Sequence, residues 1–376
     1  DPTANSAIIC QHPSGGGVNI LALTFDAAGN APPMLGLTEA LIARGHAVAI
    51  LGHDNQAARI EAAGAAFLHL QTAPQRDGAS AEPLTMAWAE SFDHAAAWDL
   101  FSAARRRGAD VLVVDSLLSA CLDAAIASHW RTIDLCHTPY EIMATFLDGR
   151  FRPGLEGSDL TVISSYAAFH AGPPVPANAV FAGPLRPAAK PGAWTRRHPD
   201  KPLVLASLST GQQNQRPVLE RLCRALAEVD AEALVTTGAA MSPEGLAQGP
   251  LMSLERDVPH ETLAPMADLV VTHAGHGTLS FALAAGVPML CLPGGGDQPA
   301  NADRVVALEL GERLDLGAAP EVVAEAVRRL LADKALRERA RAFARIVNAE
   351  PGPKPALERI EALARQPLPG RPDPAP

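Results

Sequence analysis

The chain has 376 residues, a formal net charge of −10 at pH 7, and 48% hydrophobic but only 4% aromatic residues. This length exceeds the size at which a single hydrophobic core usually stops growing, so two domains are expected. The apolar content is too high, and the charged fraction of 19% too low, for a chain that stays disordered. Abundant Ala and Val with few aromatic residues favour helices packed on strands, which is an α/β protein.

The composition also excludes several partners. A net negative charge with one short basic run, Arg105–Arg107, gives no electrostatic footprint for nucleic acid. No apolar stretch reaches the roughly 20 residues of a membrane span, and the start lacks the basic and apolar regions of a secretory signal. An odd number of scattered cysteines argues against a disulfide framework or a structural zinc, so a reducing cytoplasm is expected. The five cysteines are Cys10, Cys121, Cys136, Cys223 and Cys291.

Residues 18–183 alternate short apolar runs with longer segments of helical spacing, which predicts a Rossmann-like domain. Its first unit is the strand VNILALTF, a helix from Pro32 to Arg44, and the strand AVAIL. Proline suits the first turn of such a helix. Further short, apolar, β-branched runs are typical of strands buried on both faces of a parallel sheet. These runs lie at 111–115, 132–135, 160–164 and 180–183.

The remaining segments complete the domain organisation. Residues 184–200 are rich in proline and charge without periodicity, as in a domain linker. A second alternation over 201–365 predicts another Rossmann-like domain, with two terminal helices from Pro320 onward. Residues 1–17 are either a natural N-terminal extension or a peptide joined through a glycine linker, and residues 366–376 are expected to be a disordered tail.

One loop between a strand and a helix predicts an anion site. His273 stands at the carboxyl end of the strand DLVVTH, where ligands bind in open α/β sheets. Gly275, Gly277 and Thr278 open the following helix, whose N-terminus offers unpaired N–H groups and the positive end of the helix dipole. Glycine allows close approach, Thr278 can donate a hydroxyl hydrogen bond, and His273 can bond or neutralise a phosphate oxygen. The alternative is an ordinary strand-to-helix turn.

A second loop predicts a sugar site. Pro293 and the glycines after it lead sharply to Asp297 and Gln298, which start another helix. The carboxylate can accept from two hydroxyl groups and the amide can both donate and accept, as a polyol requires. Asp297 could instead serve only as the helix N-cap.

The order H-x-G-x-G-T, a G-V-P strand, and D-Q-x-x-N-A resembles the donor-binding signature of family-one, GT-B glycosyltransferases, and most closely the bacterial group that modifies macrolides and other natural products. The likeness runs from about Val18 to Arg365. It implies two Rossmann-like domains whose parallel sheets face a central cleft. It also implies that 18–183 binds the acceptor and that 201–365 binds the nucleotide sugar.

The resemblance assigns roles to individual residues. It implies that His273, Gly275, Gly277 and Thr278 hold the diphosphate, and that Asp297 and Gln298 hold the donor sugar. It further implies phosphate or base contacts by Ser207 and Thr210, and a nucleobase resting on the segment of Arg256 and Val258. Members that use uridine sugars often place a glutamate against the ribose where this chain has Phe281. Loss of that acceptor favours a dTDP-sugar, whose deoxyribose lacks one hydroxyl group.

The first domain departs from the family at the catalytic base. In the family a histidine follows the glycine after the first strand and is oriented by an aspartate from a later strand. Here the histidine position is Asn30, while the aspartate matches Asp115. An amide cannot accept a proton at neutral pH, and general base catalysis contributes roughly a hundred- to ten-thousandfold.

Three solutions are open. Asp115 or Asp26 acts as the base while Asn30 positions the acceptor, or His137 in DLCHTPY replaces the lost imidazole, or the acceptor needs no strong base. Each residue also has a purely structural reading: Asp115 as a helix cap, Asp26 and Asn30 as turn residues, and His137 as a structural histidine.

The sequence therefore predicts an enzyme, an inverting glycosyltransferase that moves a sugar from a dTDP- or UDP-sugar to a small, apolar natural product or a peptide. No metal and no cofactor beyond the donor are expected, because a helix dipole and hydrogen-bond donors can stabilise the leaving diphosphate. One alternative is a catalytically impaired homologue that acts as a binding or auxiliary protein, for which Asn30 argues. A further alternative is a nucleotide-sugar epimerase. The oligomeric state, including a homodimer, is left open.

Overall fold

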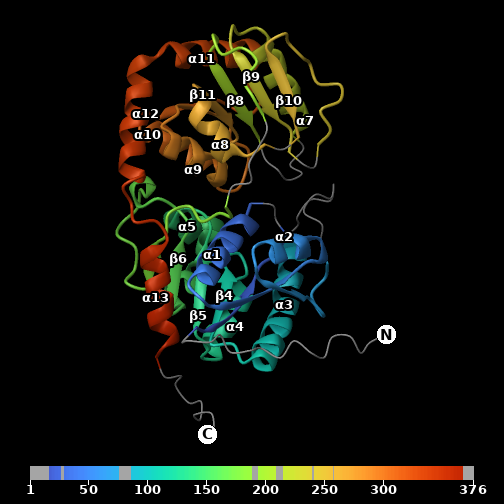
Figure 1. Cartoon of the computed structure of the whole chain (residues 1–376), viewed down its shortest axis with the longest axis vertical. Helices are drawn as coiled ribbons and strands as arrows, with labels where there is room; N and C mark the ends of the chain where they lie inside the picture. The colour runs from blue at the N-terminus through green and yellow to red at the C-terminus, as the bar shows by residue number, and fades with distance from the viewer. Residues whose placement is uncertain are drawn as a thin grey trace.

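The computed structural model describes residues 17–26, 29–75, 86–188, 194–208, 215–238, 241–256 and 258–366, and it confirms the α/β fold. Two separate parallel sheets, each flanked by helices, lie one beyond the other along the long axis of the molecule (Figure 1). We call residues 17–188 the first half and residues 194–347 the second half. Thr210, the N-terminal residues 1–16 and the tail 367–376 lie outside the described residues.

The sheet of the first half has seven strands in the order β3-β2-β1-β4-β5-β6-β7, all paired in parallel. The strands are β1 (Asn19–Leu23), β2 (Ala47–Gly52), β3 (Ala66–His69), β4 (Val111–Asp115), β5 (Thr132–Cys136), β6 (Leu160–Ile163) and β7 (Ala179–Phe181). The helices are α1 (Ala31–Ala43), α2 (Ala57–Ala62), α3 (Met86–Arg107), α4 (Ser119–Ala127), α5 (Tyr140–Gly149) and α6 (Arg152–Gly157), with short 3₁₀ turns η1 (Asp54–Gln56) and η2 (Ala167–Phe169).

The sheet of the second half has six parallel strands in the order β10-β9-β8-β11-β12-β13. The strands are β8 (Leu203–Ser207), β9 (Glu232–Thr236), β10 (Met252–Glu255), β11 (Leu269–Thr272), β12 (Met289–Cys291) and β13 (Gly311–Arg313). The helices are α7 (Arg216–Ala227), α8 (His260–Leu263), α9 (His276–Ala285), α10 (Gln298–Ala307), α11 (Pro320–Ala332) and α12 (Lys334–Val347), with the 3₁₀ turn η3 (Ala264–Met266).

The inner strands are apolar because both of their faces are covered. Every residue of β1, β4, β5, β8 and β9 is buried, as the apolar runs predicted. The strands β3, β10 and β13 were not predicted from the sequence. They lie at sheet edges and are partly exposed, so they lack a continuous apolar run.

The C-terminal helix differs from expectation. Three helices, not two, follow Pro320, and the third, α13 (Lys354–Ala364), returns to the first half instead of packing on the second. Its residues Ala356, Leu357 and Ile360 join the core that also contains strand β1. Arg359 donates to the carbonyls of Ala177 and Ala179 beside β7. The predicted boundary 201–365 therefore includes one helix that packs with the other sheet (Figure 1).

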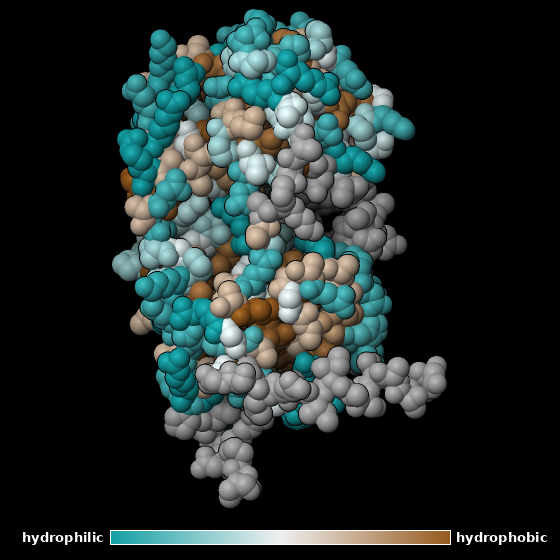
Figure 2. Space-filling model, in the orientation of Figure 1, coloured by the Kyte–Doolittle hydropathy of each residue, from teal (hydrophilic) through white to brown (hydrophobic). Residues whose placement is uncertain are grey.

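The visible surface separates by polarity. In Figure 2 hydrophilic residues line the top, where α11 runs, and the upper left side, where α12 begins, and hydrophobic residues gather on the visible face of the lower half. Among the described residues, no helix is long and apolar enough to cross a membrane.

The chain crosses from the first half to the second in a segment that begins near Arg186, and this crossover lies against α1. A Cβ atom on Gly36, in the middle of α1, would lie 2.2 Å from the backbone N of Arg186. Real Cβ atoms do not approach backbone this closely, so glycine at this position allows the crossover to pass over the helix.

We therefore predict that Gly36→Ala destabilises the protein, although alanine normally stabilises a helix interior by roughly 0.5–1 kcal/mol relative to glycine. Overpacking against fixed backbone should lower the free energy of unfolding by about 2 kcal/mol. Thermal or denaturant unfolding measures the change. Gly317→Ala is the control, because its new Cβ would have no atom within 4 Å. Equal stability of the two variants would contradict the close packing of the crossover.

Candidate functional site

The polar residues of interest lie at the carboxyl ends of the central strands in both sheets. Asp115 is the last residue of β4, His137 follows β5, and His273 follows β11. Because the strands are parallel, their carboxyl ends lie at one edge of each sheet. The contacts between the two halves, described below, lie at these edges of the two sheets.

The N-terminus of α9 is arranged as an anion site. Gly275 is its N-cap, and a Cβ there would lie 2.3 Å from Nε2 of His273, so the imidazole packs directly on the glycine. Burial, and secondarily the neighbouring His260, lower the pKa of His273 to about 4. The ring is therefore neutral at physiological pH. It can bond a phosphate oxygen but carries no charge to neutralise one.

The second loop is bonded to the first. Asp297 occupies the N-cap position of α10 without capping it. Its Oδ2 accepts from Nδ2 of Asn301 at 2.7 Å, and its carboxylate also accepts from the backbone N–H of His276 in α9. Asn301 donates in addition to the carbonyl of Ala274 at 3.0 Å. The two predicted loops thus form one continuous site, and Asn301, one helical turn after Asp297, connects them.

Gln298 has a structural contact within this loop. Its Oε1 accepts from the backbone N–H of Gly294 at 2.8 Å, which closes the glycine-rich turn. Burial raises the pKa of Asp297, while the charge of His137 in the first half lowers it. The carboxylate of the second half is therefore within electrostatic reach of the imidazole of the first.

In the first half, Asp115 has partners on both carboxylate oxygens. Nδ2 of Asn30 donates to Oδ2 at 3.1 Å, and the backbone N–H of Leu117 donates to Oδ1 at 2.9 Å. Nδ1 of His137 lies 3.4 Å from the same Oδ1, at ion-pair distance. Asn30 also donates to the carbonyl of Phe25 at 2.9 Å. Asp115 is fully buried and His137 is nearly so. The structure therefore brings together three of the four predicted catalytic residues.

Asp26 has a different environment. Its Oδ2 accepts from Nδ2 of Asn55 at 2.7 Å, which is a contact to the segment after β2. Asp115, the other acid predicted as a possible base, lies at ion-pair distance from the imidazole of His137.

The pKa of His137 is raised by its neighbours. Burial alone would lower it, but the carboxylate of Asp115, followed by the charges of Asp297 and Asp134, overcomes that effect. Asp134 lies on β5 beside these residues, where it accepts from the Ser116 hydroxyl, and burial raises its pKa to about 7. The imidazole is thus oriented by one carboxylate and attracted by a second across the two halves.

His276 is a contact that the sequence reasoning missed. It is the first residue of α9, and its Nε2 lies 3.0 Å from the carbonyl of Ser164, which follows β6. Burial lowers its pKa to about 4, so the neutral ring donates this bond. The loop of the second half that was predicted to bind the diphosphate is thereby bonded to the end of β6 in the first half. No local motif marks such a partner, because the two residues are 112 positions apart.

Phe281 of α9 stacks on a residue beside the segment predicted to carry a nucleobase. The ring of His260 lies 6.0 Å from that of Phe281 between centroids, and the guanidinium of Arg186 lies 4.0 Å from the centroid of the Phe281 ring. Val258 is buried and Arg256 is exposed. Ser207 ends β8 and is buried. No three potential metal ligands cluster anywhere among the described residues.

Sequence comparisons find a likeness to a known family from α7 to the C-terminal helix α13. Residues 220–363 match the family model described as erythromycin biosynthesis protein CIII-like, C-terminal domain. Demethyllactenocin mycarosyltransferase of Streptomyces fradiae is 34% identical over 190 residues, which are 49% of this chain and 40% of that relative. The chain thus spans less than half the length of the curated relatives it matches.

Solved structures extend the likeness to the whole fold. The glycotransferase of kitacinnamycin has a TM-score of 0.76 and 23% identity, and the match covers 92% of this chain and 99% of that one. The glycosyltransferase VinC in complex with dTDP has a TM-score of 0.71 and 19% identity, with the same coverage. The fold is GT-B, and the resemblance to natural-product glycosyltransferases is confirmed.

The three histidines of the site should titrate in two groups. We predict that His137 titrates above the ordinary pKa of 6.5, whereas the pKa values of His273 and His276 lie near 4. Asp115→Asn removes the main attraction and should lower the pKa of His137 without moving the other two. Heteronuclear NMR of the imidazole rings measures all three. A His137 titration that is unchanged in Asp115→Asn would contradict the pairing.

Proposed function

We propose that the protein is an inverting glycosyltransferase that uses a nucleotide diphosphate sugar. The observation that carries this proposal is the pair of His137 and Asp115, whose Nδ1 and Oδ1 atoms lie 3.4 Å apart. The charge of His137 also attracts Asp297, which stands on the loop next to the N-terminus of α9. A base oriented by a carboxylate on one side, and an anion site on the other, are the two parts that sugar transfer requires.

His137 is the proposed general base. Its Nδ1 faces Asp115, which leaves Nε2 to take the proton from an acceptor hydroxyl group. The acceptor oxygen then forms the new bond to the anomeric carbon as the bond to the diphosphate breaks on the opposite face, so the configuration inverts. Asp115 stabilises the imidazolium that results. Asn30 donates to the second oxygen of Asp115 and keeps the carboxylate in place.

The leaving diphosphate takes its stabilisation from α9. Its dipole and the N–H groups that follow His276, whose own N–H bonds Asp297, are proposed to face the developing negative charge together with Thr278 and His273. Asp297 and Gln298 are proposed to hold the sugar hydroxyl groups. This chemistry needs no metal ion and no cofactor beyond the donor.

The donor is proposed to be a dTDP-sugar in preference to a UDP-sugar. Phe281 and the Arg186 guanidinium stacked on it offer no carboxylate to a ribose hydroxyl pair. The complex of VinC with dTDP supports the same choice of nucleotide. A small natural product is the proposed acceptor, in line with the name of the mycarosyltransferase relative, and a peptide is the alternative.

The argument for a catalytically silent homologue was the amide at position 30. The position of His137 weakens that argument, because an imidazole contacts Asp115 from β5 instead of from α1. The epimerase alternative has no observation of its own in its favour.

Donor binding and transfer should respond to different residues. His273→Ala is expected to weaken binding of dTDP or UDP by about tenfold, through one lost hydrogen bond. His137→Ala should leave nucleotide binding unchanged and lower kcat by about a hundred- to ten-thousandfold. Calorimetry with both nucleotides and mass detection of the glycosylated product measure the two effects. The function would be refuted if neither nucleotide bound and His273→Ala changed nothing.

The rate should depend on pH through His137. A base must be neutral to accept a proton, so kcat/KM should rise with pH through a pKa that lies above 6.5. Asp115→Asn lowers that pKa and should shift the acidic limb of the profile to lower pH while reducing kcat. An acidic limb that stays in place in Asp115→Asn would assign the base to another residue.

A further inference from the structure

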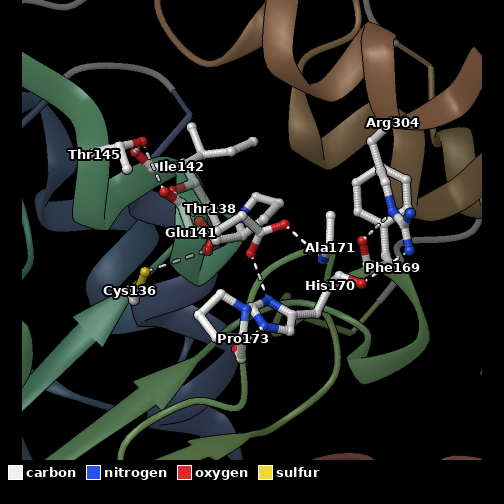
Figure 3. Close-up of polar contacts among 11 residues, drawn as sticks. Cys136, Thr138, Glu141, Ile142, Thr145, Phe169, His170, Ala171, Pro173 and Arg304 are labelled. Atoms are coloured by element: carbon white, nitrogen blue, oxygen red, sulfur yellow. Dashed lines mark hydrogen bonds and ion pairs between the residues drawn. The ribbon is translucent and has the colours of Figure 1, made fainter. Parts of the chain in front are cut away.

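A second set of contacts joins the two halves beside the proposed site, and it starts on the helix that carries the sugar loop. Arg304 lies on α10, about two turns after Asp297. Its Nε donates to the carbonyl of Phe169 at 2.9 Å, and its Nη2 donates to the carbonyl of His170 at 2.8 Å. Figure 3 shows the guanidinium reaching from α10 to this segment of the first half.

The segment that Arg304 holds is fastened in turn to α5. The carboxylate of Glu141 accepts from the backbone N–H of Ala171 at 3.0 Å, and lies 2.6 Å from Nδ1 of His170 (Figure 3). The other ring nitrogen, Nε2, lies 2.7 Å from the carbonyl of Pro173. Glu141 is the second residue of α5, four positions after His137. A continuous chain of contacts therefore leads from the Asp297 helix to the helix that follows His137.

We propose that Arg304 is a positioning residue that fixes the sugar loop relative to His137, because the segment that it holds is fastened by Glu141 to the helix that follows His137. We call Arg304, His170 and Glu141 the clasp. This inference rests on the proposed function. The expected result of breaking the clasp is a lower kcat/KM with an unchanged affinity for the nucleotide.

The segment around His170 has further contacts on both sides. Glu141 on α5 faces the ring, and Arg304 on α10 contacts the backbone carbonyl of His170. The ring of Phe181 on β7 lies 5.6 Å away and is uncharged. Glu350, after α12, bonds the backbone N–H groups of Ala167 and Ala168 at the other end of η2.

The role of Arg304 is tested with a matched arginine. Arg313 forms an ion pair with Asp303 on the same helix α10 but makes no recorded contact to the described residues of the first half. Arg304→Ala should lower kcat/KM by about tenfold to a hundredfold, the range expected for misplacing reacting groups by about 1 Å. Arg313→Ala should change it less than twofold. Arg304→Lys should recover part of the loss, and nucleotide affinity should stay constant in all three variants.

The hold of Glu141 on the same segment is tested by Glu141→Ala. This variant removes the acceptor of the Ala171 backbone N–H and the partner of Nδ1 of His170. kcat/KM should fall by about as much as in Arg304→Ala, and the double variant should lose less than the product of the two factors, because both residues act on one segment. Glu141→Gln keeps an oxygen that can accept from Ala171 and should retain most of the activity.

The outcomes separate this inference from the proposed function. Equal activities of Arg304→Ala and Arg313→Ala, or full activity in Glu141→Ala, would overturn the clasp while transfer itself stands. A wild-type protein that binds no nucleotide would instead refute the function. Thermal unfolding of each variant shows whether a loss of activity reflects loss of fold.

Discussion

The buried carboxylate of Asp115 is the group on which the arrangement of the cleft depends. It is 0% exposed, and a buried charge without partners costs several kcal/mol. Leu117 and His137 contact one of its oxygens, and Asn30 bonds the other. Removing one partner of a buried charge typically costs about 3–5 kcal/mol. The stability of the first half and the orientation of His137 therefore depend on the same contacts.

Backbone groups and apolar side chains both join the segment 164–170 of the first half to the rest of the molecule. His276 bonds the carbonyl of Ser164, Arg304 bonds two carbonyls at the end of η2, and Glu350, after α12, bonds two N–H groups at its start. The side chains of Tyr166 and Phe169 pack in the core of the second half. Together these contacts fix where the segment lies, and with it the distance between the strand ends of the two halves.

The difference between local and distant contacts explains what the sequence could predict. The loops at His273 and Asp297 were predicted because strand, glycine turn and helix start are adjacent in the chain. Asp115 and His137 were each predicted to stand at the end of a strand. Their pairing depends on β4 and β5 being neighbours in the sheet, and the apolar runs of the sequence do not specify the order of the strands. Edge strands such as β3 were not predicted, because they are partly exposed and lack a continuous apolar run. The bonds of Arg304 span more than 130 positions, and no pattern in the sequence marks them.

The amide at position 30 has a role in this arrangement that an imidazole would not fill in the same way. Asn30 donates to both Asp115 and the carbonyl of Phe25, and an amide keeps its protons across the physiological pH range. It therefore holds the carboxylate equally well whether His137 is charged or neutral. In the proposed mechanism the proton acceptor has moved from the start of α1 to the end of β5, while the carboxylate that orients it has stayed on β4. One oxygen of Asp115 is thus held by Asn30, a partner that does not titrate, and the other faces His137, a partner that does.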